Sequence, residues 1–413
     1  MNQTVNSTVL LPWQRTVVGI AWMTYAAYYL GRVNLAVAIP DMTVDLALSK
    51  SQIGLISTVF IFSYSLGTLL NVWLGDRLNL RRFVAVGLIG SGVLTILFGS
   101  LSAWRVLLFV WIIGGYFQAM GWGPILRTLA NWLTPAQRQK VSGFFGSSFA
   151  AGSAITWLLT GWLVVNFGWR MAFWIPGILM IIAGLIWYTT IRDTPQEAGY
   201  ALDRTTPSEI LPISIVDFIL AFLQSFRRLW TLTIAAIFAG FIFAAFTVWI
   251  PTYYVEVGGL NIGLASTLSA LLPFVGIGGT LLISWLITRY FEGEEAMGLI
   301  IILIILTILF LAYPAIPFDL VISSGALMLV GSVTFGATSL LLATMTMTFG
   351  QLEETSSIAG LLDFSFSLGG AFTGIIIGAI LDFQSWNMVF FVLAGAAFVS
   401  ACFIYLTRLR FSG

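Results

Sequence analysis

Two tyrosines and an arginine near the start of the chain are the residues best suited to bind a ligand. Tyr25, Tyr29 and Arg32 follow one another at the spacing i, i+4 and i+7, which places them on one face of a predicted helix. The guanidinium of an arginine is a planar fork of donors that matches phosphate or carboxylate oxygens. Because a charge at membrane depth is costly, we expect Arg32 to bind an anion. A purely structural pairing with an internal carboxylate or carbonyl is the alternative.

A second pair of polar and aromatic residues lies in the fourth apolar stretch. Gln118 and Trp122 are four residues apart, so on a continuous helix they share a face. They offer hydrogen bonds and a stacking surface to a polyol or sugar, and helix packing is the alternative. Arg127 follows near the end of the same stretch. We expect Arg127 to act as a gate or as the partner of a loop acid rather than as a substrate ligand.

An acid stands inside the eleventh apolar stretch. Asp363 is surrounded by apolar and small residues, and an ionisable group in such a position is a hypothesis of function. Three roles are open to it: a partner in an ion pair, a proton carrier, or a receptor for a cationic group.

The composition shows which elements must position these residues. The chain has 413 residues, of which 59% are hydrophobic and 8% charged, whereas a soluble domain carries about 25% charged residues. Apolar stretches near the length of about 20 residues needed to cross a bilayer recur twelve times. We therefore predict an all-α membrane protein with twelve spans. The predicted spans are 16–38, 52–74, 84–103, 106–130, 142–165, 171–191, 229–250, 264–288, 297–316, 319–349, 356–381 and 387–408.

The basic residues predict the orientation of these spans. With the N-terminus inside, thirteen Lys and Arg residues lie in cytoplasmic segments and three in outer ones. Cytoplasmic loops of membrane proteins carry the excess of Lys and Arg, so both termini are expected to be cytoplasmic.

A polar segment divides the chain. Residues 192–228 read as a cytoplasmic linker, with a surface helix around 211–224, between a first bundle at 1–191 and a second at 229–413. The two parts also resemble each other at an offset of 217 residues, which aligns Gly152 with Gly369 and Trp169 with Trp386. Such a repeat predicts a duplicated bundle with a central site between its halves.

The residue types also exclude several kinds of site. The chain has no histidine and one cysteine, Cys402, so neither a histidine-based metal site nor an intrachain disulfide is expected. It contains no Gly-Lys-Ser/Thr phosphate loop, which leaves ATP-driven transport unsupported. We expect no enzymatic activity, no cofactor, no metal and no nucleic-acid partner. We expect a monomer in a lipid bilayer.

Five motifs resemble those of the organophosphate:phosphate antiporter family of the major facilitator superfamily. They are spread over nearly the whole chain. The matching segments are Tyr25 to Asn34, Asp76 to Arg81, Gln118 to Thr128, Trp249 to Tyr253, and Gly276 to Leu282.

The resemblance implies two pseudo-symmetric six-helix bundles that open alternately to either side of a membrane, expected to be a bacterial cytoplasmic one. It implies a small organic anion as substrate, with an organophosphate or sugar phosphate as the first expectation. Arg32 matches the first of the family's two clamp arginines. The second falls on Phe243, and the spacing from Arg32 to Pro40, mapped onto Pro251, gives the same position. The helix-5 histidine of the family falls on Ser148.

Three charged residues resemble the superfamily's inner-loop motif. Asp76, Arg77 and Arg81 match it, although its usual leading glycine is Val72 here. The resemblance implies that they bias gating rather than recognise cargo.

Two alternatives to phosphate antiport stay open. A proton-coupled symporter of a carboxylate or sugar acid would use Asp363. The expected coupling ion is thus phosphate for antiport or a proton for symport. The third hypothesis is a transporter-like membrane sensor.

Overall fold

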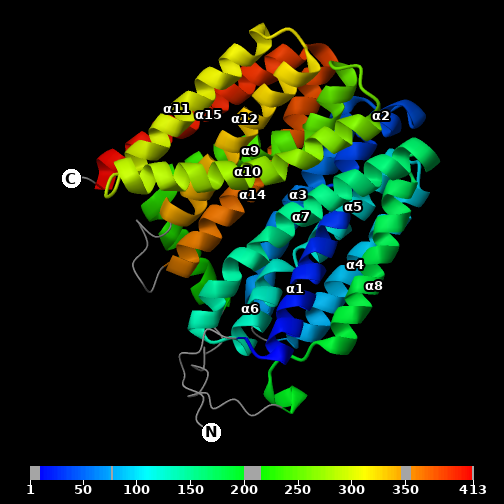
Figure 1. The fold of residues 1–413 in the computed structure, drawn as a ribbon, viewed down its shortest axis with the longest axis vertical. Coiled ribbons are helices and arrows are strands. Elements are labelled where there is room, and N and C mark those ends of the chain that lie inside the picture. Colours follow the sequence, from blue (N-terminus) through cyan, green and yellow to red (C-terminus); the bar gives the residue numbers. More distant parts are fainter. Residues whose placement is uncertain (1–9, 76–77, 200–214, 346–354, 412–413) are drawn as a thin grey trace.

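The computed structural model describes residues 10–75, 78–199, 215–345 and 355–411, and these residues are helical apart from short connections (Figure 1). No strand occurs among them. The α-helices are α1 (Pro12–Leu30), α2 (Asn34–Asp45), α3 (Lys50–Gly75), α4 (Leu80–Ser100), α5 (Trp104–Gln118), α6 (Trp122–Trp132), α7 (Pro135–Phe167), α8 (Met171–Thr190), α9 (Ile215–Glu256), α10 (Ile262–Tyr290), α11 (Glu295–Ala312), α12 (Leu320–Ser339), α14 (Thr355–Phe383) and α15 (Trp386–Phe411). The short elements are η1 (Gln196–Ala198), η2 (Tyr313–Ala315) and the π-helical η3 (Leu340–Thr344).

The predicted all-α membrane architecture is confirmed. Eleven helical segments of the described chain are long and apolar enough to cross a membrane. The first predicted span, 16–38, is not one continuous helix, because α1 ends at Leu30 and α2 begins at Asn34. Residues 192–199 of the predicted linker contain η1, and residues 215–228 begin α9, which bends at Leu229 before its apolar portion.

The helices form two groups that meet at one end. Figure 1 shows α1 to α8 on one side and α9 to α15 on the other, with the groups diverging toward the side of both termini. At the converging end a Cβ built on Gly54 of α3 would lie 2.0 Å from the carbonyl oxygen of Gly374 of α14. At the diverging end a Cβ on Gly146 or Gly360 would meet nothing within 4 Å. The bundle is therefore closed at one end and open at the other.

Charged residues reinforce the closed end. The carboxylate of Asp382 accepts hydrogen bonds from the backbone N–H groups of Lys50 at 2.8 Å and Ser51 at 3.0 Å. These are among the first N–H groups of α3, which have no partner within their own helix. The Lys50 ammonium also pairs with Glu256 of α9 at 2.7 Å. An acid of one helix group thus caps a helix of the other.

The sequence repeat corresponds to repeated contacts. The indole N–H of Trp169 donates to Asp45 at 2.9 Å, and that of Trp386 donates to Glu256 at 3.0 Å. Asp45 is the last residue of α2 and Glu256 the last residue of α9. Trp169 lies two residues before α8, and Trp386 is the first residue of α15. The two halves therefore share the same kind of contact, a hydrogen bond from an indole to a carboxylate.

The aligned glycines act alike as well. A Cβ on Gly152 of α7 would lie 2.8 Å from the carbonyl oxygen of Ala26, and one on Gly369 of α14 would lie 1.8 Å from that of Ile237. Both glycines let two helix backbones approach closely. These contacts support the proposed division into two bundles, whose boundaries stay a prediction.

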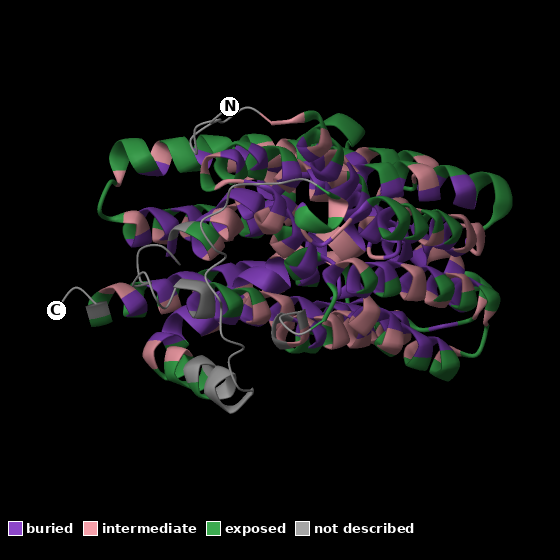
Figure 2. Ribbon diagram, turned by 90° about the horizontal axis from the view of Figure 1, so that it is seen from below, coloured by how far each residue is buried: buried purple, intermediate pink, exposed green. Residues whose placement is uncertain are grey.

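Large apolar side chains also cover the outside. Figure 2 shows many exposed positions along the outer faces and buried ones inside the bundle. Phe109 and Leu281 are 64% and 68% exposed. A soluble protein rarely leaves so many apolar side chains uncovered, and lipid is their natural solvent.

Candidate functional site

Two helix breaks lie side by side at the centre of the first half. Residues 31–33 separate α1 from α2, and residues 119–121 separate α5 from α6. Gly31 fits the first break because a Cβ there would lie 2.8 Å from the sulfur of Met180 and 3.0 Å from Nε2 of Gln118. Carbonyl groups at a helix end lack partners within the helix, so they are free to bind other groups.

Arg32 occupies one break and binds the other. Its Nη2 donates to the backbone carbonyl of Gln118 at 3.5 Å and to the side-chain Oε1 of Gln118 at 3.4 Å. Its Nη1 donates to the Tyr29 hydroxyl at 3.4 Å. These contacts are long for charge-assisted hydrogen bonds. The guanidinium is therefore held in place while its N–H groups can still donate to a ligand.

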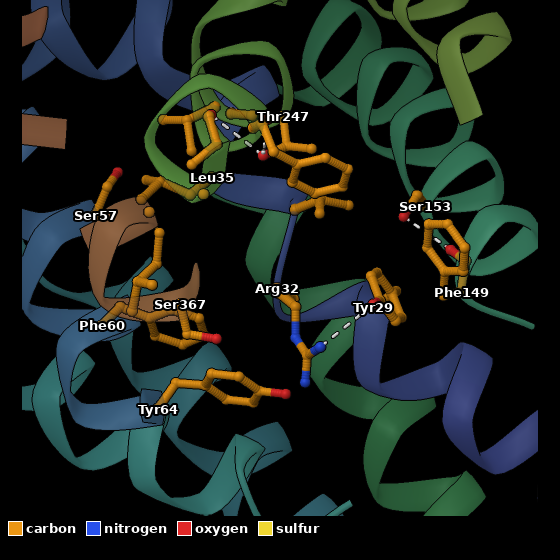
Figure 3. A pocket seen from close by; sticks show the side chains of 18 of the residues that line it. Tyr29, Arg32, Leu35, Ser57, Phe60, Tyr64, Phe149, Ser153, Thr247 and Ser367 are labelled. Carbon is orange, nitrogen blue, oxygen red and sulfur yellow. Dashed lines mark hydrogen bonds between the residues drawn. The ribbon is translucent and has the colours of Figure 1, made fainter. Parts of the chain in front are cut away.

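Two aromatic rings frame the guanidinium. The carbon Cζ of Arg32 lies 4.7 Å from the ring centre of Tyr29 and 4.5 Å from that of Tyr64 (Figure 3). No carboxylate of the described residues comes within 4.0 Å of it, and its Nε has no hydrogen-bond partner. Arg32 is half-buried, and a cation removed from water without a counter-ion is costly unless a ligand supplies the negative charge.

A cavity extends from Arg32 across the middle of the bundle. It has an empty volume of about 1030 Å³, including space open to solvent, and its wall includes Tyr29, Arg32, Tyr64 and Phe243. Among the described residues no group of three or more His, Cys, Asp or Glu could hold a metal ion.

The site residues predicted from sequence take different places around this cavity. Tyr29, Arg32 and Phe243 line it. Tyr25 lies behind them, buried, with its ring centre 4.7 Å from that of Trp122 and 5.8 Å from that of Phe145.

The predicted shared helix face holds for Tyr25 and Tyr29 on α1 but is wrong for Arg32 and for the pair of Gln118 and Trp122. Arg32 lies beyond the end of α1, so it does not share a helix face with Tyr25 and Tyr29. Gln118 ends α5 and Trp122 begins α6, so the two side chains lie on different helices and do not share a face. Gln118 is 1% exposed whereas Trp122 is 38% exposed. Each break carries a glycine, Gly31 or Gly121, at which a Cβ would collide with side chains of a neighbouring helix. The spacing rule holds only on a continuous helix.

Two further predicted residues lie outside the cavity wall. Ser148 is fully buried, and its hydroxyl donates to the carbonyl of Phe145 one turn earlier in α7. Arg127 is half-buried on α6 and does not line the cavity.

Asp363 lies on α14 one turn before Ser367, which lines the cavity. Its side chain is exposed, and no hydrogen bond or ion pair joins it to the described residues. It interacts electrostatically with Arg32 and with Tyr64. Asp363 therefore lies within electrostatic range of Arg32 without forming an ion pair with it.

The sequence reasoning missed several residues of the cavity wall. Tyr64 is a second ring beside Arg32, and Phe149, Phe335 and Phe366 join Phe243 in an aromatic cluster. The sequence features that could have indicated them are the position of Phe149 next to Ser148 and that of Phe366 three residues after Asp363.

Only some of the predicted gating residues lie in the described part of the chain. Asp76 and Arg77 lie outside the described residues. The backbone N–H of Arg81 donates to Asp193 at 2.6 Å, and its guanidinium stacks 4.4 Å from the Tyr188 ring centre. Burial raises the pKa of the Asp193 carboxyl. Arg81 thus fastens α4 to the end of α8.

The fold has close structural relatives. A bacterial homolog of the human lysosomal transporter Spinster, solved in an inward-facing, unoccupied conformation, aligns with a TM-score of 0.77 and 16% identity. The alignment covers 97% of this chain and 96% of that one. At this identity the similarity shows the fold alone.

The sequence decides the family. A profile described as Major Facilitator Superfamily matches residues 21–373. The chain belongs to the major facilitator superfamily. As a member of this superfamily it is a multi-pass membrane protein, with the family and the fold of transporters.

Two relatives within the superfamily cover almost the full chain. The glycerol-3-phosphate transporter of Bacillus subtilis (strain 168) is 28% identical over 93% of this chain and 89% of its own length. A probable hexose phosphate transport protein of Chlamydia trachomatis serovar D is 27% identical over 94% of this chain and 89% of its own.

Proposed function

We propose that this protein is a secondary active transporter of a small organic anion, with a phosphate ester as the first expectation. The observation that carries the proposal is the central guanidinium of Arg32, framed by Tyr29 and Tyr64 and without a carboxylate partner among the described residues. The names of the two relatives support a phosphate ester as the anion.

The arrangement suggests how binding and movement are linked. Arg32 would hold the anionic group, with Tyr29 and Tyr64 donating hydrogen bonds. The closed end carries Lys50 and Arg170, and the open end carries most of the basic residues, so the positive-inside rule makes the open end cytoplasmic. The described conformation is then inward-open in a bacterial cytoplasmic membrane, and opening the contacts near Asp382 would expose the site to the outside.

Phosphate exchange tests the proposal. Proteoliposomes loaded with phosphate would be given radiolabelled phosphate, and the native protein compared with Arg32→Ala. Arg105→Ala is the matched control, because Arg105 is exposed and outside the cavity. Exchange lost in Arg32→Ala and kept in Arg105→Ala supports the proposal. Native rates in Arg32→Ala would refute it.

Proton-coupled symport is the second candidate, favoured by the unpartnered carboxylate of Asp363. A carboxylate that alternates between the two sides of a membrane can load and release a proton. In that case uptake would follow the pH gradient, and Asp363→Asn would abolish this dependence while leaving substrate binding in place.

A further inference from the structure

The two sides of the cavity differ in chemistry. The wall from the first half carries Arg32 together with Ser57 and Trp157. Arg32 Nε, Ser57 Oγ and Trp157 Nε1 are buried and have no hydrogen-bond partner. The wall residues from α9 onward include no charged side chain. The cationic donor for an anion therefore lies on one side only, and the other side adds just the hydroxyl groups of Thr247 and Ser367.

The opposite side carries three phenylalanines from α9, α12 and α14, and these form an aromatic cluster with Phe149 of the first half. The ring centres of Phe243 and Phe335 are 4.8 Å apart, and those of Phe243 and Phe366 are 5.4 Å apart. Phe149 of α7 stacks on Phe335 at 6.4 Å. The faces of aromatic rings are electronegative, so such a cluster attracts cations and repels anions.

A carboxylate stands on the same face as this cluster. Asp363, Phe366 and Ser367 are spaced i, i+3 and i+4 on α14, and the last two line the cavity. Asp363 is exposed and forms no hydrogen bond or ion pair with the described residues, and its electrostatic interaction with Arg32 acts over a longer distance. A ligand that carried only negative charge would meet repulsion from this side.

A ligand with charges of both signs would be complementary to both sides of the cavity. We infer that the transported molecule is zwitterionic, an organic phosphate that also bears an ammonium group. Its anionic end binds Arg32, and its ammonium group lies between Asp363 and the aromatic cluster. This inference rests on the proposed function and names the class of substrate.

Two probes of equal shape test the inference. Choline phosphate carries a quaternary ammonium, and 3,3-dimethylbutyl phosphate replaces that nitrogen with carbon. Binding of each to the purified full-length protein in detergent would be measured by titrating the thermal unfolding temperature. We expect the native protein to bind choline phosphate at least tenfold more tightly than its neutral isostere.

The variants assign the preference to named residues. Asp363→Asn should bring the two affinities within about threefold while keeping the neutral isostere bound, since a desolvated ion contact is worth about tenfold or more. Phe243→Arg should reverse the preference, because it places a cation beside the ammonium group. Glu292→Gln, at an exposed loop acid, is the control and should behave like the native protein.

The outcomes separate the inference from the proposed function. Equal binding of both probes by the native protein, with both lost in Arg32→Ala, would overturn the inference and leave the anion site standing. A preference that survives in Asp363→Asn would also overturn the inference. Binding unaffected by Arg32→Ala would instead overturn the proposed function.

Discussion

Arg32 and Gln118 meet where two helices are broken. The Nη2 of Arg32 lies 3.4 Å from Oε1 and 3.5 Å from the backbone oxygen of Gln118, the last residue of α5. Gln118 is thus a neutral acceptor that holds the guanidinium without cancelling its charge. Discontinuous helices place binding groups of transporters at mid-membrane in this way.

A charge at Gln118 should therefore block the site. Gln118→Glu is expected to lower phosphate exchange by roughly tenfold to a hundredfold, because a carboxylate beside Arg32 competes with the anion for a charge-assisted hydrogen bond. Exchange in proteoliposomes measures the effect. Gln196→Glu, on an exposed turn, should keep native rates, and equal losses in both variants would contradict the assignment.

The ring of Tyr64 should matter more than the hydroxyl of Ser148. Tyr64→Leu removes the ring that lies 4.5 Å from Arg32, and we expect about a tenfold weaker affinity for phosphate. Ser148→Ala removes a hydroxyl bound within its own helix, and its affinity should stay native. Phosphate titrations of thermal stability measure both. The opposite ranking would place the phosphate near Ser148, on α7.

Close packing at Gly369 should control stability. Its Cβ would lie 1.8 Å from the carbonyl oxygen of Ile237, so Gly369→Ala must push α14 away from α9. Overpacking of this kind costs roughly 1–3 kcal/mol, which corresponds to a fall of several degrees in Tm. Gly395→Ala is the control, since a Cβ there meets nothing within 4 Å. Equal Tm values for the two variants would show that α14 can move away from α9 without loss of stability.

Loss of the cap at Asp382 should open the closed end. Ser57→Cys, in a Cys402→Ser background, reports access to the cavity, because Ser57 is buried and lines it. Adding Asp382→Asn should raise the rate at which an impermeant maleimide labels position 57 of the Ser57→Cys variant several-fold. The reason is that two N–H groups of α3 lose a charged acceptor.

Asp319→Asn is the matched control for this experiment. Asp319 caps its own helix, α12, and joins no residue of the first half. Faster labelling in that control as well would mean that any lost helix cap, rather than the contact between the halves, exposes the cavity.

The ion pair of Asp45 should make stability depend on pH in acid. Hydrogen bonds from Arg170 and Trp169 lower the pKa of Asp45. Its stabilisation is therefore present above the unfolded-state pKa of about 3.9 and is lost as the pH falls through the lower folded-state value. Native protein should exceed Asp45→Asn in Tm at pH 7, and by less at pH 3. A gap that widens in acid would contradict this sign.

Part of the site could be read from local patterns. Arg32 is recognisable because an arginine inside an apolar stretch is costly wherever it lies. Phe243 follows from the spacing of Arg32 to Pro40 and of its counterpart to Pro251, and both Arg32 and Phe243 line the cavity. Patterns that assume an unbroken helix failed, as for Gln118 and Trp122, because nothing in the spacing reveals where packing interrupts a helix.

The sequence alone determined the membrane class, the repeat and the central arginine, since hydropathy and charge act wherever a residue lies along the chain. Only the tertiary structure decided which side chains surround that arginine. Tyr64 and the cluster of Phe149, Phe335 and Phe366 come from helices far apart in sequence. Their meeting depends on how closely the backbones approach at glycines such as Gly152 and Gly369, and that distance is set by the packing of whole helices.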